Sequence, residues 1–377
     1  MFLRVDYNVP LRGTAITDDT RIRATLPTIE YLLAHHAAVI IASHLGRPKG
    51  TWKEELSLAP VAHRLSELLH QPVEMAPDCV GSETEAMARS LQPGQLIMLE
   101  NLRFHPEEEA NDQAFAGRLA SLADLYVDDA FGAAHRAHAS TEAIAHLLPA
   151  AAGLLMEREI EALSGALHHA QPPFIAVIGG AKISTKMALI ENLLTRVDAL
   201  IIGGGMANTF LAAKGYEVGS SLVEADLIPM AKELLGRASA DRLLLPVDVV
   251  VAPNVSSAGQ RRTVAVDQVP PDWTIVDAGS ASLERFCERI HSSRTVLWNG
   301  PMGIFEEPAF AAGTLAIGRC VAASQAESIV GGGDSVAALD QMGLTNSMSH
   351  VSTGGGATLE FLEGKTLPGI AVLEQSG

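Results

Sequence analysis

No long apolar run interrupts this sequence, although 47% of its 377 residues are apolar. A helix needs about 20 consecutive apolar residues to span a bilayer, and no run approaches that length. The first ten residues include Arg4 and Asp6 and lack the apolar segment of a signal peptide. The sequence therefore predicts neither a membrane span nor an export signal, and we expect a cytoplasmic protein.

Cysteine is scarce. The three cysteines, Cys79, Cys287 and Cys320, stand far apart in the sequence and are odd in number. Disulfide and zinc frameworks are recognised by closely spaced or paired cysteines. The pattern therefore predicts a reducing compartment, no disulfide bond and no zinc framework.

Positive charge is also scarce, since 27 basic residues face 44 acidic ones and the formal net charge is -17. Such a balance argues against nucleic acid or an anionic membrane as a partner. An acidic protein that binds anions must gather its few basic side chains in one place. The positions of the arginines are therefore more informative than their number.

Three common motifs are absent. The phosphate-binding pattern G-x-x-x-x-G-K-[ST] fails at Gly364-Lys365-Thr366, because Leu359 stands where the first glycine is needed. No strand is followed by G-x-G-x-x-G, the dinucleotide-binding fingerprint. The G-x-S-x-G elbow of many hydrolases is absent as well.

Short apolar runs alternate with helical patterns along the whole chain, which predicts parallel α/β sheets. The length favours two domains. We therefore expect an α/β fold of two Rossmann-like lobes, each a parallel sheet flanked by helices. Residues 154–167 form an amphipathic pattern that ends before Pro172-Pro173. We interpret residues 154–171 as a helical connector that joins the lobe of residues 1–153 to the lobe that begins at residue 172.

In the first half, polar or basic residues follow each apolar run. Ligands of parallel sheets bind beyond the carboxyl ends of the strands. This rule brings four side chains to one edge of the sheet: His44, Arg47, Arg103 and Arg136. Arg21 lies on the connection after the first strand and could join them. A single arginine in such a place is usually solvated or paired with a carboxylate, but arginines after several strands predict a site for a small, multiply charged anion.

In the second half, apolar runs end in glycines instead. The strand Phe174–Ile178 is followed by Gly179-Gly180, then by Lys182 and Lys186, with a helix expected over residues 184–194. Lysines four residues apart near a helix start would face the same way and, with backbone N–H groups, form an anion site. An ordinary strand-to-helix turn with two solvated lysines is the alternative. Three further glycine runs after strands favour phosphate binding.

These blocks together resemble the phosphoglycerate kinase family over residues 4–369. The matching segments are RVDYNVP at 4–10, SHLGRP at 43–48, LENLRF at 99–104, DAFGAAHRAH at 129–138, GGAK at 179–182, GGGMA at 203–207, WNGPMGIFE at 298–306, GGGDS at 331–335 and STGGGA at 352–357. So many blocks in the family's order make the resemblance highly specific.

The resemblance implies reversible phosphoryl transfer between 1,3-bisphosphoglycerate and ADP, giving 3-phosphoglycerate and ATP, with Mg²⁺ bound through the nucleotide at Asp334. It implies an N-terminal triose-phosphate domain, a nucleotide domain at 172–364 and a segment 365–377 that returns to the first domain. The implied triose contacts are Asp6, Tyr7, Asn8, Arg21, His44, Leu45, Gly46, Arg47, Arg103 and Arg136. The implied nucleotide contacts are Lys182, Lys186, Gly203, Gly204, Gly205, Asn299, Glu306, Gly332, Gly333, Asp334 and Ser335. Arg21, Lys182 and Gly355 are the implied catalytic groups.

One feature departs from the family. A further lead-in normally precedes Arg-Val-Asp, whereas here Met1 stands three residues before Arg4. Either the start is misplaced or the first strand is short at its entry end, and no site residue is lost in either case. We expect a monomer whose lobes close on the substrates by bending of the connector. The competing hypotheses are a non-catalytic anion- or nucleotide-binding relative and a kinase for another phosphorylated acid.

Overall fold

The computed structural model describes residues 1–239 and 241–374. Contacts divide the chain into two units, of which unit 1 is Met1–Glu161 together with the segment from Lys365, and unit 2 is Ala162–Gly364. The boundary lies inside helix α6 (Leu154–His168), within the segment that the sequence assigns to a connector. Helix α14 (Pro368–Glu374) belongs to unit 1, where Gly369 donates its N–H to the carbonyl of Ala134.

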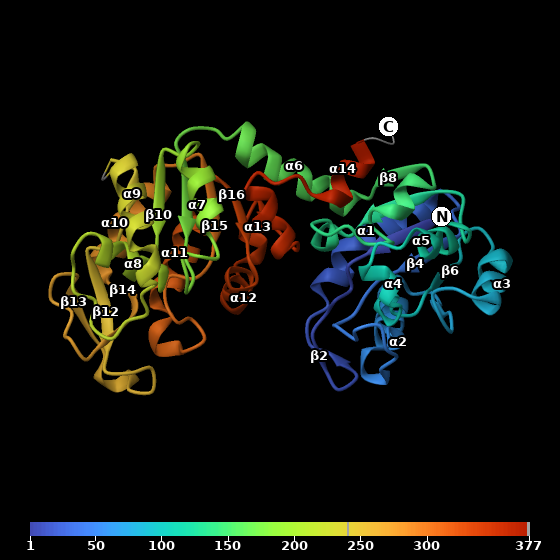
Figure 1. Ribbon diagram of the computed structural model, residues 1–377, viewed down its shortest axis with the longest axis horizontal. Helices are drawn as coiled ribbons and strands as arrows, with labels where there is room; N and C mark the ends of the chain where they lie inside the picture. The colour runs from blue at the N-terminus through green and yellow to red at the C-terminus, as the bar shows by residue number, and fades with distance from the viewer. Residues whose placement is uncertain (240, 375–377) are drawn as a thin grey trace. The chain divides into compact units, whose positions relative to one another are not determined.

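Unit 1 is built on a parallel six-stranded sheet (Figure 1). Its strands, in spatial order, are β5 (Glu74–Met75), β6 (Leu96–Met98), β4 (Val39–Ala42), β1 (Phe2–Val5), β7 (Tyr126–Asp129) and β8 (Ala150–Ala152). A short antiparallel hairpin, β2 (Leu11–Arg12) and β3 (Ala15–Ile16), follows the first strand. On one side of β1 lie β4, then β6, with β5 at the edge, and on the other side lie β7 and β8. The chain therefore moves to opposite sides of β1, and the strand order reverses there.

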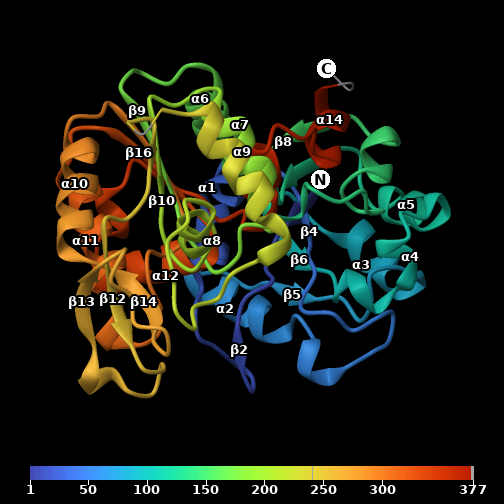
Figure 2. The ribbon, with the colours of Figure 1, turned by 60° about the vertical axis from the view of Figure 1, so that its left-hand side comes forward.

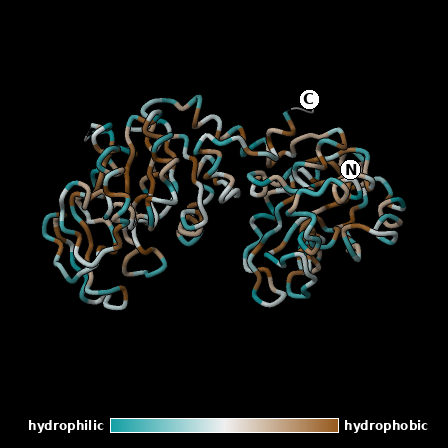
Figure 3. The backbone as a smooth tube through the Cα atoms, viewed as in Figure 1, coloured by the Kyte–Doolittle hydropathy of each residue, from teal (hydrophilic) through white to brown (hydrophobic). Residues whose placement is uncertain are grey.

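Strand residues in unit 1 alternate between two cores, which explains why the strands are apolar throughout. Phe2 and Ile40 face the core completed by α5 (Gln113–Ala120), η4 (Ala143–His146) and α14, whereas Leu3 and Ile41 face the core completed by α1 (Thr20–Ala34) and α2 (Ala59–Leu69). Figure 3 shows the strands as hydrophobic segments of the backbone trace. The remaining short elements are α3 (Ser82–Ser90), α4 (Pro106–Glu109), η1 (Glu54–Leu56), η2 (Leu102–Phe104) and η3 (Phe131–Ala133).

Unit 2 repeats the plan with a second parallel six-stranded sheet. Its strands, in spatial order, are β11 (Leu243–Leu244), β10 (Ala199–Ile202), β9 (Phe174–Ile178), β15 (Thr295–Asn299), β16 (Glu327–Gly331) and β17 (His350–Val351). Its helices are α7 (Met187–Leu194), α8 (Met206–Ala213), α9 (Ile228–Arg237), α10 (Ser280–His291), α11 (Ala312–Ala323), α12 (Gly333–Met342) and α13 (Gly356–Leu362), with single turns η5 (Ala225–Leu227), η6 (Ala258–Gln260), η7 (Pro308–Phe310) and η8 (Thr345–Ser347). The order reverses between β9 and β15. The prediction of two parallel sheets flanked by helices is confirmed.

The sequence missed a third sheet. Strands β13 (Arg262–Ala265), β12 (Asp248–Ala252) and β14 (Thr274–Ala278) form an antiparallel sheet in unit 2, visible beside α8 in Figure 2. The expected helix over 184–194 also proves shorter, because α7 begins at Met187 with Lys186 as its N-cap.

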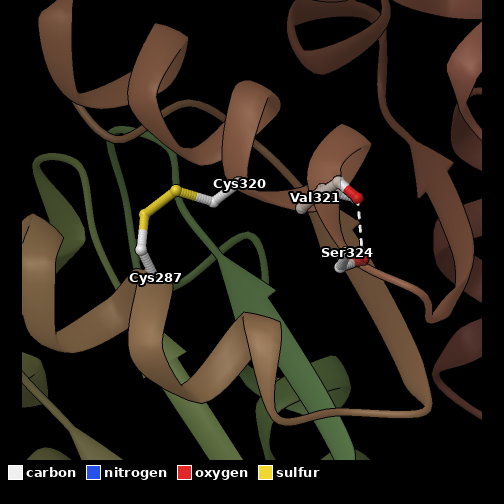
Figure 4. The surroundings of a disulfide bond; sticks show 4 residues. All are labelled: Cys287, Cys320, Val321 and Ser324. Atoms are coloured by element: carbon white, nitrogen blue, oxygen red, sulfur yellow. Dashed lines mark hydrogen bonds between the residues drawn. A yellow bond between two sulfur atoms is a disulfide. The ribbon is translucent and has the colours of Figure 1, made fainter.

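The prediction of no disulfide is wrong. Cys287 of α10 and Cys320 of α11 are joined by a disulfide bond (Figure 4). The two helices pack side by side over one face of the unit 2 sheet, with Phe286 and Ile317 in its core (Figure 2). Two cysteines that are isolated in sequence are therefore neighbours in the fold. The isolated positions of the cysteines no longer support the expectation of a reducing compartment.

Among the described residues, no helix combines the length and the apolar character that a membrane span requires.

Candidate functional site

Basic side chains gather at the carboxyl ends of the unit 1 strands. We call Arg4, Arg21, His44, Arg103 and Arg136 the basic cluster. Arg21 Nη1 donates to Asp6 Oδ2 at 2.8 Å, and Arg4 Nη2 lies 3.2 Å from His44 Nδ1. Burial lowers the pKa of Arg103, and the charges of Arg4 and Arg136 lower it further. Four of the five predicted basic residues are thereby brought within electrostatic reach of one another.

Arg4 is the member that the sequence analysis missed. Its side chain is fully buried, and its Nε donates to Ser140 Oγ at 2.8 Å. That hydroxyl donates in turn to Glu108 Oε1 at 2.6 Å, and the Ser140 N–H donates to the other oxygen of Glu108. Burial raises the pKa of Glu108, and Arg4 opposes that rise. An arginine inside the apolar run Phe2–Val5 was the available signal, because a buried charge requires partners.

The contact with Arg4 fixes the tautomer of His44. Burial lowers the pKa of His44 well below its usual value of 6.5; Asp6 opposes this shift, and the positive charge of Arg4 adds to it. The ring is therefore neutral at neutral pH. A guanidinium can only donate hydrogen bonds, so Nδ1 accepts from Arg4 and the single ring proton lies on Nε2. Nε2 is 3.8 Å from Asp6 Oδ1, and His44 presents an N–H donor on that side.

Asp6 holds two of the predicted residues in place. Burial raises its pKa, but His44, Arg21 and Arg4 together outweigh this effect, so the net pKa is below the usual value. Asp6 is thus ionised at neutral pH and orients Arg21 through the 2.8 Å ion pair. Asn8 acts on the next loop, since its Oδ1 accepts the N–H of Gly46 at 2.8 Å.

The loop after β4 is locked by backbone contacts. Gly46 has a φ of 63°, a left-handed conformation that favours glycine, and a Cβ there would lie 2.7 Å from the end of the Leu56 side chain. Its carbonyl accepts from Arg103 Nη1 at 3.0 Å. Leu45 is buried in the core, and both of its backbone polar groups are bound by Asn101. Leu45 therefore shapes the loop and offers no free polar group.

Two further predicted residues differ in environment from the rest. Tyr7 is fully buried, and its hydroxyl pairs with Thr25 Oγ1 at 2.7 Å, so its side chain supports the fold. Arg47 is exposed, and in the described part of the chain no hydrogen bond or ion pair joins it to the basic cluster. Arg136 is half-buried, and its Nε donates to His135 Nε2 at 3.1 Å.

Unit 2 contains a cavity of about 300 Å³ beside the carboxyl ends of β9 and β10. Glycine loops form one wall, and the antiparallel sheet missed by the sequence analysis forms another. Its lining includes Gly204, Gly205, Val249, Val276, Glu306 and Asp334. Asp277 also borders it, and burial raises the pKa of this carboxyl to about 7. A mostly apolar slot with carboxylates at its border fits a flat heterocycle with a polar extension.

Lys186 stands where the strand order reverses. Its Nζ donates to the carbonyls of Gly179 at 2.8 Å and Asn299 at 3.0 Å, and to Asn299 Oδ1 at 2.6 Å. Gly179 and Asn299 terminate β9 and β15, so the ammonium lies between the two central strand ends. Burial lowers its pKa to about 8, and Asp334 opposes that shift. Ligands of open α/β sheets bind in the crevice at such a point.

Lys182 does not share a helix face with Lys186, contrary to the prediction. It is exposed in the turn before α7, where its carbonyl accepts from Thr185 Oγ1 at 2.9 Å. The same turn is tied to Glu224, which accepts the Ser184 N–H at 3.1 Å. One lysine is therefore anchored between strands, and the other is free to reach outward.

The glycine runs have two different causes. Gly204 has a φ of 67°, and a Cβ there would collide with the backbone of Gly180, so this run allows three loops to pack together. Gly203 instead makes room for Met302, whereas a Cβ at Gly333 or Gly355 would meet nothing within 4 Å. The openings of α12 and α13 therefore leave backbone space for a ligand.

The other predicted nucleotide residues divide similarly. Asn299 is buried and bound to Lys186, and Ser335 Oγ accepts the N–H of Gly300 at 2.6 Å. Both hold the strand ends in place. Gly332, with a φ of 91°, caps α12 and turns the chain into the helix. Glu306 and Asp334 are exposed at the cavity, and the charge of Asp334 acts on Lys186.

Comparisons with known proteins agree with this arrangement. The family model described as phosphoglycerate kinase matches residues 1–365. The chain is 58% identical to "Phosphoglycerate kinase" of Moorella thermoacetica over 100% of its own length and 96% of that protein, and 57% identical to that of Thermomicrobium roseum over 99% and 96%. It resembles the solved structure of phosphoglycerate kinase from Coxiella burnetii with a TM-score of 0.90 and 45% identity, covering 99% of this chain and 95% of the other. With matches that span both units, this chain belongs to the phosphoglycerate kinase family.

Proposed function

We propose that this chain transfers a phosphoryl group reversibly between 1,3-bisphosphoglycerate and ADP, giving 3-phosphoglycerate and ATP in glycolysis or the reverse direction. The observation that carries the proposal is the presence of two complementary sites in one member of this family. Unit 1 carries the basic cluster, and unit 2 carries the cavity with Lys186 at its strand ends. One site suits a small polyanion, and the other suits a nucleotide.

In unit 1, we propose that the basic cluster and Arg47 hold the triose. Arginine guanidinium groups bind carboxylate and phosphate oxygens through paired N–H donors. Neutral His44 adds its Nε2–H, and Asp6 keeps Arg21 oriented until the ligand arrives. Asn8 and Gly46 set the loop that carries Arg47.

In unit 2, we propose that the base enters the cavity beside Gly204 and Gly205 and that Glu306 binds the ribose. The phosphates then extend toward Lys186 and the opening of α12. Asp334 at that opening is an exposed carboxylate, the oxygen ligand that Mg²⁺ prefers. When bound with the nucleotide, Mg²⁺ neutralises phosphate charge.

We propose in-line transfer without a covalent enzyme intermediate. Positioning and charge neutralisation provide most of the catalysis in such reactions. Arg21 and the exposed ammonium of Lys182 neutralise the charge of the transferred group, and the open backbone at Gly355 adds an N–H donor. Closure of the two units during transfer remains a prediction, which small-angle scattering with both substrates would test. The monomeric state is also a prediction, which light scattering would test.

The decisive experiment is a coupled assay with 3-phosphoglycerate, ATP and Mg²⁺. We expect ADP formation that depends on 3-phosphoglycerate. Arg136→Lys should weaken binding of 3-phosphoglycerate and leave binding of ADP alone unchanged, because an ammonium cannot reproduce a guanidinium fork. Absence of turnover with intact ligand binding would favour a non-catalytic binding protein, and turnover only with another phosphorylated acid would favour a different kinase.

A further inference from the structure

Three potential metal ligands meet in unit 1 apart from the proposed catalytic groups. Asp78 and Cys79 lie in the loop between β5 and α3, and His105 joins η2 to α4. One ligand atom from each residue lies within 4.8 Å of the other two. His105 Nε2 and Asp78 Oδ1 are 2.6 Å apart. We propose that Asp78, Cys79 and His105 bind a Zn²⁺ ion, with water at the fourth position.

The spacing of the three ligand atoms is close to what zinc requires. Zinc takes nitrogen and oxygen ligands near 2.0–2.2 Å and sulfur near 2.3 Å, so the ligands of a tetrahedral site are roughly 3.3–3.7 Å apart. Binding therefore requires the ligand atoms of His105 and Asp78 to separate by about 1 Å and the sulfur to move inward by at most about 1.5 Å. The combination of thiolate, imidazole and carboxylate favours Zn²⁺ over Mg²⁺ or Ca²⁺.

The electrostatic setting also favours a cation. Burial raises the pKa of the Cys79 thiol well above its usual value, and the carboxylates of Asp78, Glu108 and Glu100 raise it further. The same negative charges that resist formation of a thiolate attract a divalent ion. Cys79 Sγ now donates to the carbonyl of Glu100 at 2.9 Å. Zinc would replace this proton, so binding releases one proton from the thiol, while the His105 proton moves to Nδ1.

Surrounding groups hold the ligands and leave an entry path. The His105 ring stacks on Phe115 with centroids 5.0 Å apart, and Thr84 Oγ1 donates to the carbonyl of Asp78 at 3.0 Å. Cys79 is fully buried, whereas the side chains of Asp78 and His105 are 47% and 21% exposed. An ion can therefore arrive from the solvent side, where water completes the coordination. In the metal-free protein, the Asp78–His105 hydrogen bond and the bond from Cys79 Sγ to the carbonyl of Glu100 join the two loops.

Cobalt substitution tests the proposal, since Co²⁺ occupies zinc sites and gives a thiolate-to-metal absorption band. Chelator-treated full-length protein should bind one Co²⁺ per chain with such a band, and Zn²⁺ should abolish the band by displacement. Zn²⁺ binding should release about one proton, measured by calorimetry in two buffers. Cys79→Ser should lose the band, and His105→Asn should weaken Co²⁺ affinity by at least about tenfold.

The double variant Cys287→Ser, Cys320→Ser is the matched control and should keep the band, because those cysteines lie in unit 2. A spectrum without a thiolate band at saturating Co²⁺ in the folded native protein would overturn the proposal, and so would a band that persists in Cys79→Ser. If Cys79→Ser fails to fold, the His105→Asn titration decides: unchanged Co²⁺ affinity refutes the site. None of these readouts depends on kinase activity.

Discussion

Lys186 should make ADP binding depend on pH in a way that few surface lysines could. Burial lowers its pKa to about 8 in the ligand-free protein, so the side chain is charged below that pH and neutral above it. A phosphate prefers the charged form. We therefore expect ADP affinity to be fully developed near neutral pH and to fall as the pH rises through about 8.

The magnitude follows from the titration. With a pKa of about 8, roughly nine chains in ten carry the charge at about pH 7, and roughly one in eleven does so at about pH 9. If only the charged form binds ADP, the affinity falls about tenfold across this range, equivalent to about 1.4 kcal/mol. Nucleotide phosphates lose their last proton near pH 6, so their own charge is nearly constant over the range.

Isothermal titration calorimetry without Mg²⁺ measures both parts of this expectation. The dissociation constant of ADP should rise about tenfold between about pH 7 and about pH 9. In two buffers of different ionisation enthalpy, binding at the higher pH should take up nearly one proton. Lys186→Met should bind ADP weakly and without this dependence on pH.

Lys232→Met is the matched control, because Lys232 is exposed on α9 and should leave the pH profile unchanged. A native protein whose ADP affinity stays flat over the range would refute the titration of Lys186 near pH 8. Proton uptake that survives in Lys186→Met would assign the titration to another group.

Three further predictions concern the rest of the chain. In denaturant without reductant, one of the three cysteines should react as a free thiol. Cys320→Ser should lower the free energy of unfolding by about 4 kcal/mol, the loop-closure value for cysteines 33 residues apart. Three reactive thiols without reduction would contradict the Cys287–Cys320 bond. Nitrogen NMR should show His44 as the neutral Nε2–H tautomer between about pH 5 and pH 8, because burial keeps its pKa well below 6.5 and Arg4 occupies Nδ1. The His44→Gln variant assigns the signals. An imidazolium signal from His44 in that range would contradict the neutral tautomer. Lys182→Ala should lower turnover by at least about 100-fold with a much smaller loss of ADP affinity. Normal turnover of this variant at saturating substrate would show that Lys182 contributes only to binding of the ground state.

Much of the fold could be predicted from the sequence because its causes are local. A run such as Phe174–Ile178 is apolar at every position, and only a strand buried on both faces of a sheet accounts for it at that length. Helix α5 begins at Gln113 because Asp112 accepts the N–H of Phe115 at 2.7 Å as its N-cap, a local signal that the sequence contains. Parallel strands end at one edge of a sheet, so the sequence alone groups His44, Arg103 and Arg136.

Contacts between distant segments decided the rest. The role of Arg4 depends on Ser140 and Glu108, which no periodicity in the strand Phe2–Val5 reveals. The glycines after β9 and β10 resemble a phosphate loop in sequence, but Gly204 is required by the close approach of neighbouring loops.

The sequence by itself determined the two parallel sheets, the edge that carries the basic side chains and the family, since these follow from hydrophobic patterns and short motifs. Only the tertiary structure decided that Cys287 meets Cys320, that Lys186 lies between two strand ends and that Asp78, Cys79 and His105 converge. The physical reason is that a pattern along the chain reports which face of an element is buried. Which side chains then meet depends on how helices and loops pack over the sheet, and that packing joins residues with no fixed separation in sequence.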